Sequence, residues 1–427
     1  MTRIVIVAFG TRGDVAPLTG LGTALRDRLG AEVIVAAQHP YHAMISAAGL
    51  GFRLLPKDTE QATRNSDYGQ GLVDGARTRP SRDVLVQMRQ DLAGVGEAMA
   101  GACADADLLL MEGPVGSLLG YHVAEALDIP SMGVFLQPAS PTAQFAPPVL
   151  TVRSFGGWAN RLIWHAGGVG EKVYTPLIDD LRRDLGLPVQ SRRSYQRRRA
   201  RTWPILYGYS RHVLARPTDW RPGLEVTGYW WPAGDPDWRP SAELTDFLAA
   251  GDPPAFVGLG STATAHGEQL SELFTRALRK ARVRAVIQSG WAQLRADGDD
   301  MLTIGDTPHH WLFPQLAAIV HHCGAGTTAA ALRAGVPSVP VPGIVDQPFW
   351  AHRLHALGAS TAPLRRISIT EDELAAAISS AVHESRYRER AQHLSALLVD
   401  EDGESVAADA IGTYLDQHRR THSGGQQ

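Results

Sequence analysis

The chain has little cysteine and little net charge. Among its 427 residues it has two cysteines, Cys103 and Cys323, and its formal net charge is −3. Two cysteines make neither a disulfide framework nor a zinc site, which fits a reducing compartment. Well-mixed charges leave no footprint for DNA or RNA, so we expect no nucleic-acid partner. A phosphate-bearing small ligand would have to be held locally, by loops.

A long apolar stretch is also missing at the start of the chain. Residues 1–10 contain only a short apolar run that ends at a glycine turn, which matches neither a signal-peptide core nor a spanning helix. We therefore expect a cytoplasmic protein without stable membrane insertion, present as a monomer or homodimer.

Length and pattern predict two α/β domains. Single hydrophobic cores stop growing at roughly 250–300 residues, so a chain of this length splits. Apolar, β-branched runs alternate with helically spaced segments in two separate series, as is typical of doubly wound parallel sheets. The strand-like runs are residues 4–9, 33–36, 108–111 and 131–135 in the first series, and 255–260, 285–287, 318–320 and 338–341 in the second.

A segment dense in Pro, Gly and Trp, residues 229–238, separates the two series. We expect an amino-terminal Rossmann-like domain over residues 1–232 and a carboxy-terminal Rossmann-like domain over residues 233–405. Residues 406–427 are expected to form a helix and a frayed tail.

A glycine-rich turn follows the apolar run 318–320 and precedes a helical segment. Such a turn presents backbone N–H groups and the positive end of the helix dipole to a phosphate. Gly324 and Gly326 allow close approach of the backbone, Thr327 adds a hydroxyl, and His322 offers an imidazole N–H. The spacing is neither a P-loop nor Gly-x-Gly-x-x-Gly. A turn built only for packing is the alternative.

Asp346 and Gln347 lie in a loop after the next strand-like run. Ligands of open α/β sheets bind at the carboxyl ends of strands, so this loop belongs on the same edge as the glycine-rich turn. A carboxylate beside a carboxamide can hydrogen-bond vicinal sugar hydroxyls, although an ordinary polar loop is the alternative.

These motifs together resemble a known family. The residues involved are Ser289-Gly290-Trp291, Pro308 to Gln315, His321 to Thr328, Asp346 to Trp350, Gly10 to Asp14, Phe135 to Pro138 and Val257 to Ser261. They are similar to family 1 glycosyltransferases with the GT-B fold, in the branch of sterol glucosyltransferases and antibiotic glycosyltransferases. The branch usually has glycine where Cys323 stands, while plant relatives have His-Cys-Gly.

The resemblance implies two Rossmann-like domains facing a cleft, with the acceptor on the amino-terminal one and a nucleotide sugar as co-substrate on the carboxy-terminal one. It also implies inversion at the anomeric carbon. Trp291 and Pro308 are candidates for the base or sugar, with a core tryptophan as the alternative for Trp291. The other implied contacts are Ser261, His322, Gly324, Gly326 and Thr327 for the diphosphate, Asp346 and Gln347 for the sugar, and Thr11, Arg12 and Gln137 for the acceptor.

Asp14 is the general base that the resemblance implies. Because an aspartate has an unperturbed pKa near ~4, it would have to lie in a partly dry site to accept a hydroxyl proton. A plain helix cap is the alternative role for Asp14.

The resemblance implies a reaction that needs no metal or other cofactor, because the helix dipole, backbone amides and His322 would stabilise the diphosphate. Asp297 and Asp299 spell the Asp-x-Asp of metal-dependent glycosyltransferases, but they lie in a polar segment that we interpret as a solvated turn. A non-catalytic sugar-nucleotide or lipid binding protein, and an NAD-dependent oxidoreductase, remain as alternatives. The donor could be UDP-glucose or a dTDP-deoxysugar.

Overall fold

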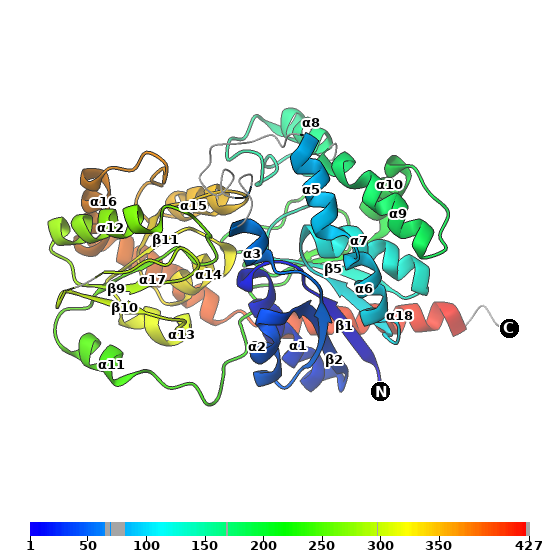
Figure 1. Cartoon of the computed structure of the whole chain (residues 1–427), viewed down its shortest axis with the longest axis horizontal. Helices are drawn as coiled ribbons and strands as arrows, with labels where there is room; N and C mark the ends of the chain where they lie inside the picture. Colours follow the sequence, from blue (N-terminus) through cyan, green and yellow to red (C-terminus); the bar gives the residue numbers. More distant parts are fainter. Residues whose placement is uncertain (65–68, 70–81, 168–169, 297, 424–427) are drawn as a thin grey trace.

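The computed structural model describes residues 1–64, 69, 82–167, 170–296 and 298–423. Within them the chain forms two parallel sheets, one of seven and one of five strands, each flanked by helices (Figure 1). This arrangement confirms the predicted α/β fold class with two Rossmann-like domains.

The amino-terminal sheet has the strand order β3-β2-β1-β4-β5-β6-β7, with every pairing parallel. Its strands are β1 (Arg3–Val7), β2 (Glu32–Gln38), β3 (Gly51–Leu55), β4 (Leu108–Met111), β5 (Ser131–Phe135), β6 (Ile205–Tyr207) and β7 (Leu224–Val226). The helices of this part are α1 (Arg12–Leu29), α2 (His42–Ala47), α3 (Thr59–Arg64), α5 (Arg82–Leu92), α6 (Val95–Cys103), α7 (Gly113–Leu127), α8 (Gly157–Gly167), α9 (Thr175–Asp184) and α10 (Arg192–Thr202).

The carboxy-terminal sheet has the order β10-β9-β8-β11-β12 and is also parallel. Its strands are β8 (Ala255–Gly258), β9 (Ala285–Gln288), β10 (Met301–Ile304), β11 (Ala318–His321) and β12 (Ser338–Pro340). The helices are α11 (Ala242–Ala249), α12 (Gly267–Ala281), α13 (His309–Leu312), α14 (Ala325–Arg333), α15 (Gln347–Ala356), α16 (Glu371–His383), α17 (Ser385–Val399) and α18 (Gly403–Ser423).

The central strands are buried on both faces, which explains their continuous apolar sequences. Residues of β1, β4, β5, β8, β9 and β11 are almost all fully buried. No helix in the described ranges combines the length and apolar character needed to cross a membrane.

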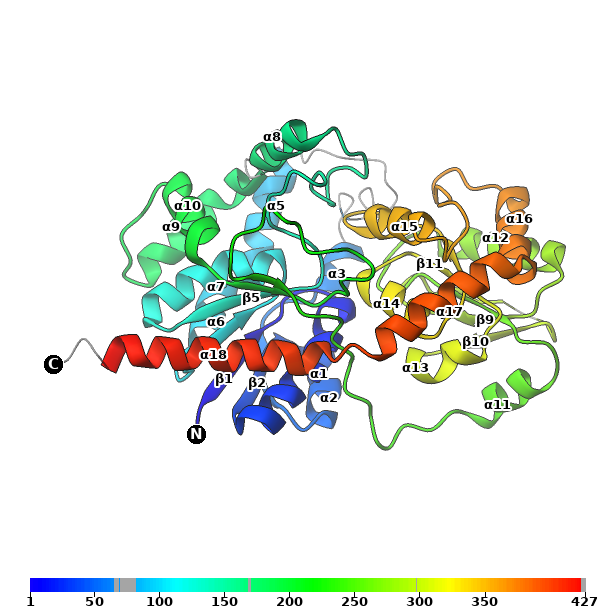
Figure 2. The ribbon, with the colours of Figure 1, turned by 180° about the vertical axis from the view of Figure 1, so that it is seen from behind.

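The last helix, α18, returns from the carboxy-terminal part to pack on α1 (Figure 2). Its inner residues join the hydrophobic core that contains Ile4 and Ile6 of β1: Ala407, Ala408, Ile411 and Leu415. The chain therefore crosses between the two parts twice, once through the segment between β7 and α11 and once between α17 and α18.

Helix α1 begins earlier than its apolar spacing predicts. The helical spacing of apolar residues from Leu18 to Leu29 predicts a helix from Leu18, after a turn at residues 10–14, but α1 starts at Arg12 and includes Pro17. Side-chain bonding between Thr11 and Asp14 supports the earlier start, as in a capping box. Pro17 lies beyond the first turn, so it removes the hydrogen bond that an N–H here would donate to the Gly13 carbonyl and crowds that carbonyl.

Candidate active site

The carboxyl ends of the strands form one edge of each sheet, and the predicted site residues lie at these edges. In both sheets the strand order reverses at one place, between β1 and β4 and between β8 and β11. Open α/β sheets bind ligands in the crevice outside the carboxyl ends at such a switch point. The fold therefore provides two half-sites, one in each domain.

The two edges face each other across the domain interface. Arg12, after β1, forms an ion pair at 3.1 Å with Asp306, after β10. The charges of Asp14 and Asp346 interact although the residues belong to opposite sheets. The interface also includes an aromatic contact between the rings of Tyr209 and Trp350, whose centroids are 5.8 Å apart.

Asp14 lies at the amino-terminal edge and is folded back onto its own loop. Its Oδ2 accepts hydrogen bonds from the Thr11 N–H at 2.6 Å and the Thr11 hydroxyl at 2.9 Å. A β-carbon at Gly10 would lie 2.2 Å from this oxygen, so any larger residue there would displace the Asp14 carboxylate. Burial raises the pKa of Asp14, and the two Thr11 bonds offset part of the rise. The structure thus gives Asp14 the capping role and an electrostatic contact with the opposite domain.

Glu112 belongs to the site, although no sequence motif indicated it. It directly follows β4, the neighbour of β1, and is fully buried. Neither carboxyl oxygen makes a well-formed hydrogen bond within the described residues. Burial raises the pKa of Glu112 well above its usual range, and the charges of Asp14 and Asp346 raise it further. The signal in the sequence is a carboxyl residue directly after the apolar run 108–111. Its position at the switch point becomes visible only in the fold.

The glycine-rich turn forms the start of α14, as the sequence predicted. Gly324 is the N-cap residue, and the first intrahelical bond runs from the Thr328 N–H to the Gly324 carbonyl. The N–H groups of Ala325, Gly326 and Thr327 therefore have no intrahelical acceptor and are oriented for an anion. Gly326 is exposed and Thr327 half-buried at this position.

His322 packs tightly beside this helix start. A β-carbon at Gly324 would lie 2.5 Å from its Nε2, and one at Gly260 would lie 2.6 Å from its Cε1. Its buried Nδ1 makes no well-formed hydrogen bond within the described chain, although the Gly258 backbone is close enough to affect the ring. Burial, and then the charge of Arg366, lower the pKa of His322 to about 4, so the ring is neutral at pH 7. Ser261 follows Gly260 in the same loop.

Two residues near the turn have left-handed backbone conformations without being glycine. Cys323 has φ +64° and Val345 has φ +62°. A β-branched residue in this region is a genuine outlier, and such strain concentrates at functional loops. Glycine would adopt the conformation of Cys323 without strain.

The loop after β12 positions Asp346 and Gln347 at the start of α15. Oδ2 of Asp346 accepts a hydrogen bond from the Trp350 indole N–H at 2.8 Å. Burial raises the pKa of Asp346 to about 6, with the Trp350 bond offsetting part of the effect. Oε1 of Gln347 accepts a hydrogen bond from the Gly343 N–H at 2.8 Å. One carboxylate oxygen of Asp346 is therefore already bonded to α15, and the side-chain oxygen of Gln347 is bonded to the loop before it.

The remaining predicted residues lie at the same edges. Trp291 is half-buried after β9, and its backbone N–H donates to the Gly260 carbonyl at 3.2 Å. Pro308 is the N-cap residue of α13. Gln137 is half-buried two residues after β5, and Thr11 and Arg12 flank the start of α1.

Asp299 of the Asp-x-Asp sequence does not reach this site. Asp299 is exposed two residues before β10, whose first residue pairs with the first residue of β9. Asp299 therefore lies at the amino-terminal edge of the sheet, opposite the glycine-rich turn, and Asp297 lies outside the described residues. Among the residues with described placement, no group of three or more His, Cys, Asp or Glu side chains could hold a metal ion.

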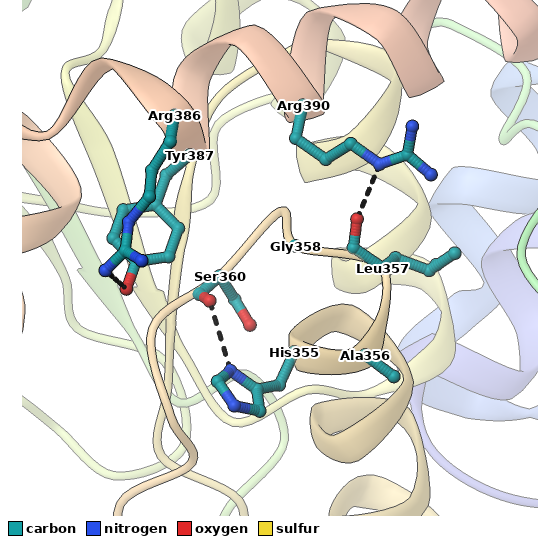
Figure 3. A pocket seen from close by; sticks show the side chains of 8 residues that line it. All are labelled: His355, Ala356, Leu357, Gly358, Ser360, Arg386, Tyr387 and Arg390. Atoms are coloured by element: carbon teal, nitrogen blue, oxygen red, sulfur yellow. Dashed lines mark hydrogen bonds between the residues drawn. The ribbon is translucent and has the colours of Figure 1, made fainter.

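Figure 3 shows a surface hollow in the carboxy-terminal part, lined by the end of α15, the residues after it and the start of α17. Its lining includes Ser360, which bridges to Ser338, the first residue of β12. The hollow is therefore at the amino-terminal edge of the sheet. Its Arg390 donates to the Leu357 carbonyl at 2.7 Å, and its Arg386 pairs with Glu384 at 2.7 Å. These side chains bond to neighbouring groups of the chain, and the hollow lies at the edge of the sheet opposite the candidate site.

Comparison with known proteins identifies relatives along almost the whole chain. Residues 285–407 match the family model described as erythromycin biosynthesis protein CIII-like, C-terminal domain. The chain is 33% identical over 453 residues to the O-mycaminosyltylonolide 6-deoxyallosyltransferase of Streptomyces fradiae, covering 99% of this chain and 100% of that protein. It is 30% identical over 434 residues to a sterol 3-beta-glucosyltransferase of Arabidopsis thaliana, covering 97% of this chain and 66% of that relative. The chain thus spans just under two thirds of the plant protein.

Solved structures show the same fold. The glycosyltransferase of kitacinnamycin superposes with a TM-score of 0.69 at 18% identity, covering 97% of this chain and 99% of that one. The Streptomyces sp. SF2575 glycosyltransferase SsfS6, complexed with thymidine diphosphate, gives 0.63 at 22% identity, covering 97% and 100%. The fold is therefore GT-B, the two-domain fold of many nucleotide-sugar-dependent transferases. The chain belongs to the family 1 glycosyltransferases, in the branch of the antibiotic and sterol enzymes.

Proposed function

We propose that this chain is an inverting glycosyltransferase that moves a sugar from a UDP- or dTDP-sugar to a hydroxyl of a small lipophilic acceptor. The observation that carries the proposal is the position of Asp14 opposite the donor loops. Asp14 lies at the β1/β4 switch point, while the start of α14 and Asp346 lie at the facing edge.

In the proposed reaction, the acceptor oxygen attacks the anomeric carbon while Asp14 takes the hydroxyl proton. The bond between the anomeric carbon and the diphosphate oxygen breaks on the opposite face, so the configuration inverts. The first-turn N–H groups of α14 and the ring of His322 stabilise the departing diphosphate, and no metal takes part. Asp346 and Gln347 hold the sugar hydroxyls.

The names of the relatives support this choice of substrates. One relative transfers 6-deoxyallose to O-mycaminosyltylonolide and another glucosylates the 3-beta position of sterols. Two solved neighbours, SsfS6 and VinC, are complexed with thymidine diphosphate. For this chain we infer an acceptor with a large apolar body and a free hydroxyl.

A thermal-shift screen of UDP, dTDP and their sugars tests donor binding first. A ligand at 100 times its dissociation constant stabilises the folded state by roughly 2.7 kcal/mol, which is easily measured. The stabilising donor is then incubated with a 3β-hydroxysterol and with a macrolide aglycone, and NMR of the product gives the anomeric configuration. Absence of binding to every nucleotide sugar, or a product with retained configuration, would contradict the proposal.

A further inference from the structure

The chain after α15 runs beside β12 as an additional extended segment. Three backbone hydrogen bonds hold it there: Ser338 N–H to Ala359 O, Thr361 N–H to Ser338 O and Leu364 N–H to Pro340 O. The segment begins at the amino-terminal end of β12 and reaches its carboxyl end at Leu364. Arg366, two residues further on, therefore emerges at the edge that holds the donor loops.

Arg366 lies near residues of both halves of the donor site. A β-carbon at Gly343, in the loop after β12, would lie 2.8 Å from its Nη2 and 2.9 Å from its Nη1. The same β-carbon would lie 2.9 Å from Oε1 of Gln347, so the guanidinium is next to the predicted sugar contact. In addition, the charge of Arg366 is close enough to His322 to lower the pKa of that ring.

The chemistry of the leaving group favours a cation beside these neutral donors. As the sugar departs, negative charge accumulates on the phosphate oxygen that it leaves. The start of α14 offers backbone N–H groups, and His322 is neutral at pH 7 because its pKa is lowered to about 4. A guanidinium donates two parallel hydrogen bonds to a phosphate and keeps its charge at every relevant pH.

On the basis of the glycosyl transfer proposed above, we propose that Arg366 binds the sugar-bearing phosphate of the donor and stabilises the charge that this phosphate gains in the reaction. A position near both His322 and Gln347 suits the junction of diphosphate and sugar. The guanidinium acts by charge and hydrogen bonding only, and it neither gives up nor accepts a proton.

Calorimetry with UDP, dTDP and the two nucleoside monophosphates tests the proposal on the intact chain. Arg366→Gln should weaken binding of the nucleoside diphosphate roughly 10- to 100-fold, as expected for loss of a charge-assisted hydrogen bond. Binding of the monophosphate, which lacks the second phosphate, should change much less. Arg366→Lys should restore part of the affinity, because it returns the charge without the planar fork.

Arg365→Gln is the matched control, since Arg365 is the exposed neighbour in the same loop. It should leave both affinities at the wild-type value, and circular dichroism checks that every variant is folded. Equal diphosphate affinity in Arg366→Gln and wild type, or equal losses for mono- and diphosphate, would overturn the assignment. A wild-type chain that binds no nucleoside diphosphate would instead contradict the proposed function itself.

Discussion

At the scale of single residues, Asp14 combines a structural and a proposed chemical role in one carboxylate. It caps α1 through Thr11, and it lies at the switch point opposite the donor loops. Asp14→Asn separates the two roles, because an amide oxygen can still accept the Thr11 N–H but cannot take a proton. We expect turnover to fall by ~10²–10⁴ while nucleoside diphosphate affinity stays unchanged, measured by steady-state rates and calorimetry.

Asp14→Ala serves as the comparison for folding. It removes the cap as well as the base, so the free energy of unfolding should fall by about 1 kcal/mol, whereas Asp14→Asn should unfold close to wild type. If Asp14→Asn retained full turnover, Asp14 would be a cap and nothing more.

Thr11 should set the pH at which Asp14 works. Its hydroxyl donates to Oδ2 at 2.9 Å and favours the ionised carboxylate, which lowers the pKa of Asp14. Thr11→Val removes this bond and keeps the backbone one, so the pKa should rise. Because the base must be ionised, the acid limb of the kcat/KM profile should move to higher pH. An unchanged acid limb, recorded between about pH 4 and 8 on a folded variant, would mean that another group limits the rate.

At the scale of elements, the start of α14 offers an anion site built from backbone. Three first-turn N–H groups without intrahelical acceptors lie beside His322, and no metal-binding cluster occurs among the described residues. We therefore expect a chelator to leave turnover unchanged in enzyme freed of divalent ions. A loss of activity that magnesium or manganese restores would show that a metal assists the leaving group after all.

The elements that the sequence predicted well are those with a strong local pattern. Buried parallel strands such as β4 and β5 appear as continuous apolar runs, and a glycine-rich turn before a helix is equally local. Glu112 and Arg366 had no such pattern. The importance of Glu112 comes from burial beside β1, and that of Arg366 from an extended segment that runs along β12. Both depend on which strands become neighbours in space.

At the scale of the whole molecule, the two connections between the domains cross at a pair of glycines. Gly228 follows β7 and Gly403 begins α18, and a β-carbon at Gly228 would lie 3.0 Å from the Gly403 Cα. Close backbone contact here fixes where α18 leaves the carboxy-terminal domain and docks on α1. The crossing therefore helps to set how Asp14 faces the donor loops.

Gly403→Ala should disturb this crossing without touching either half-site. The new β-carbon would lie 2.3 Å from the Tyr229 carbonyl oxygen and 2.6 Å from the Gly228 carbonyl carbon, so backbone must shift. Overpacking of this kind costs roughly 1–3 kcal/mol, which denaturant unfolding would detect. Turnover should fall because the domains are displaced, while affinity for the nucleoside diphosphate, bound by one domain alone, should persist.

Gly101→Ala provides the matched control for this variant. Gly101 lies in α6 with no atom within 4 Å of a β-carbon built there, so the substitution should stabilise the protein by roughly 0.5–1 kcal/mol and leave turnover unchanged. Both variants add the same methyl group, so the difference between them in stability and turnover measures the effect of the crossing alone. If Gly403→Ala matched Gly101→Ala in stability and in turnover, the glycine crossing would have no part in holding Asp14 opposite the donor loops. If Gly403→Ala lost nucleotide affinity along with turnover, the disturbance would have spread into the carboxy-terminal domain, and the two half-sites would not be independent.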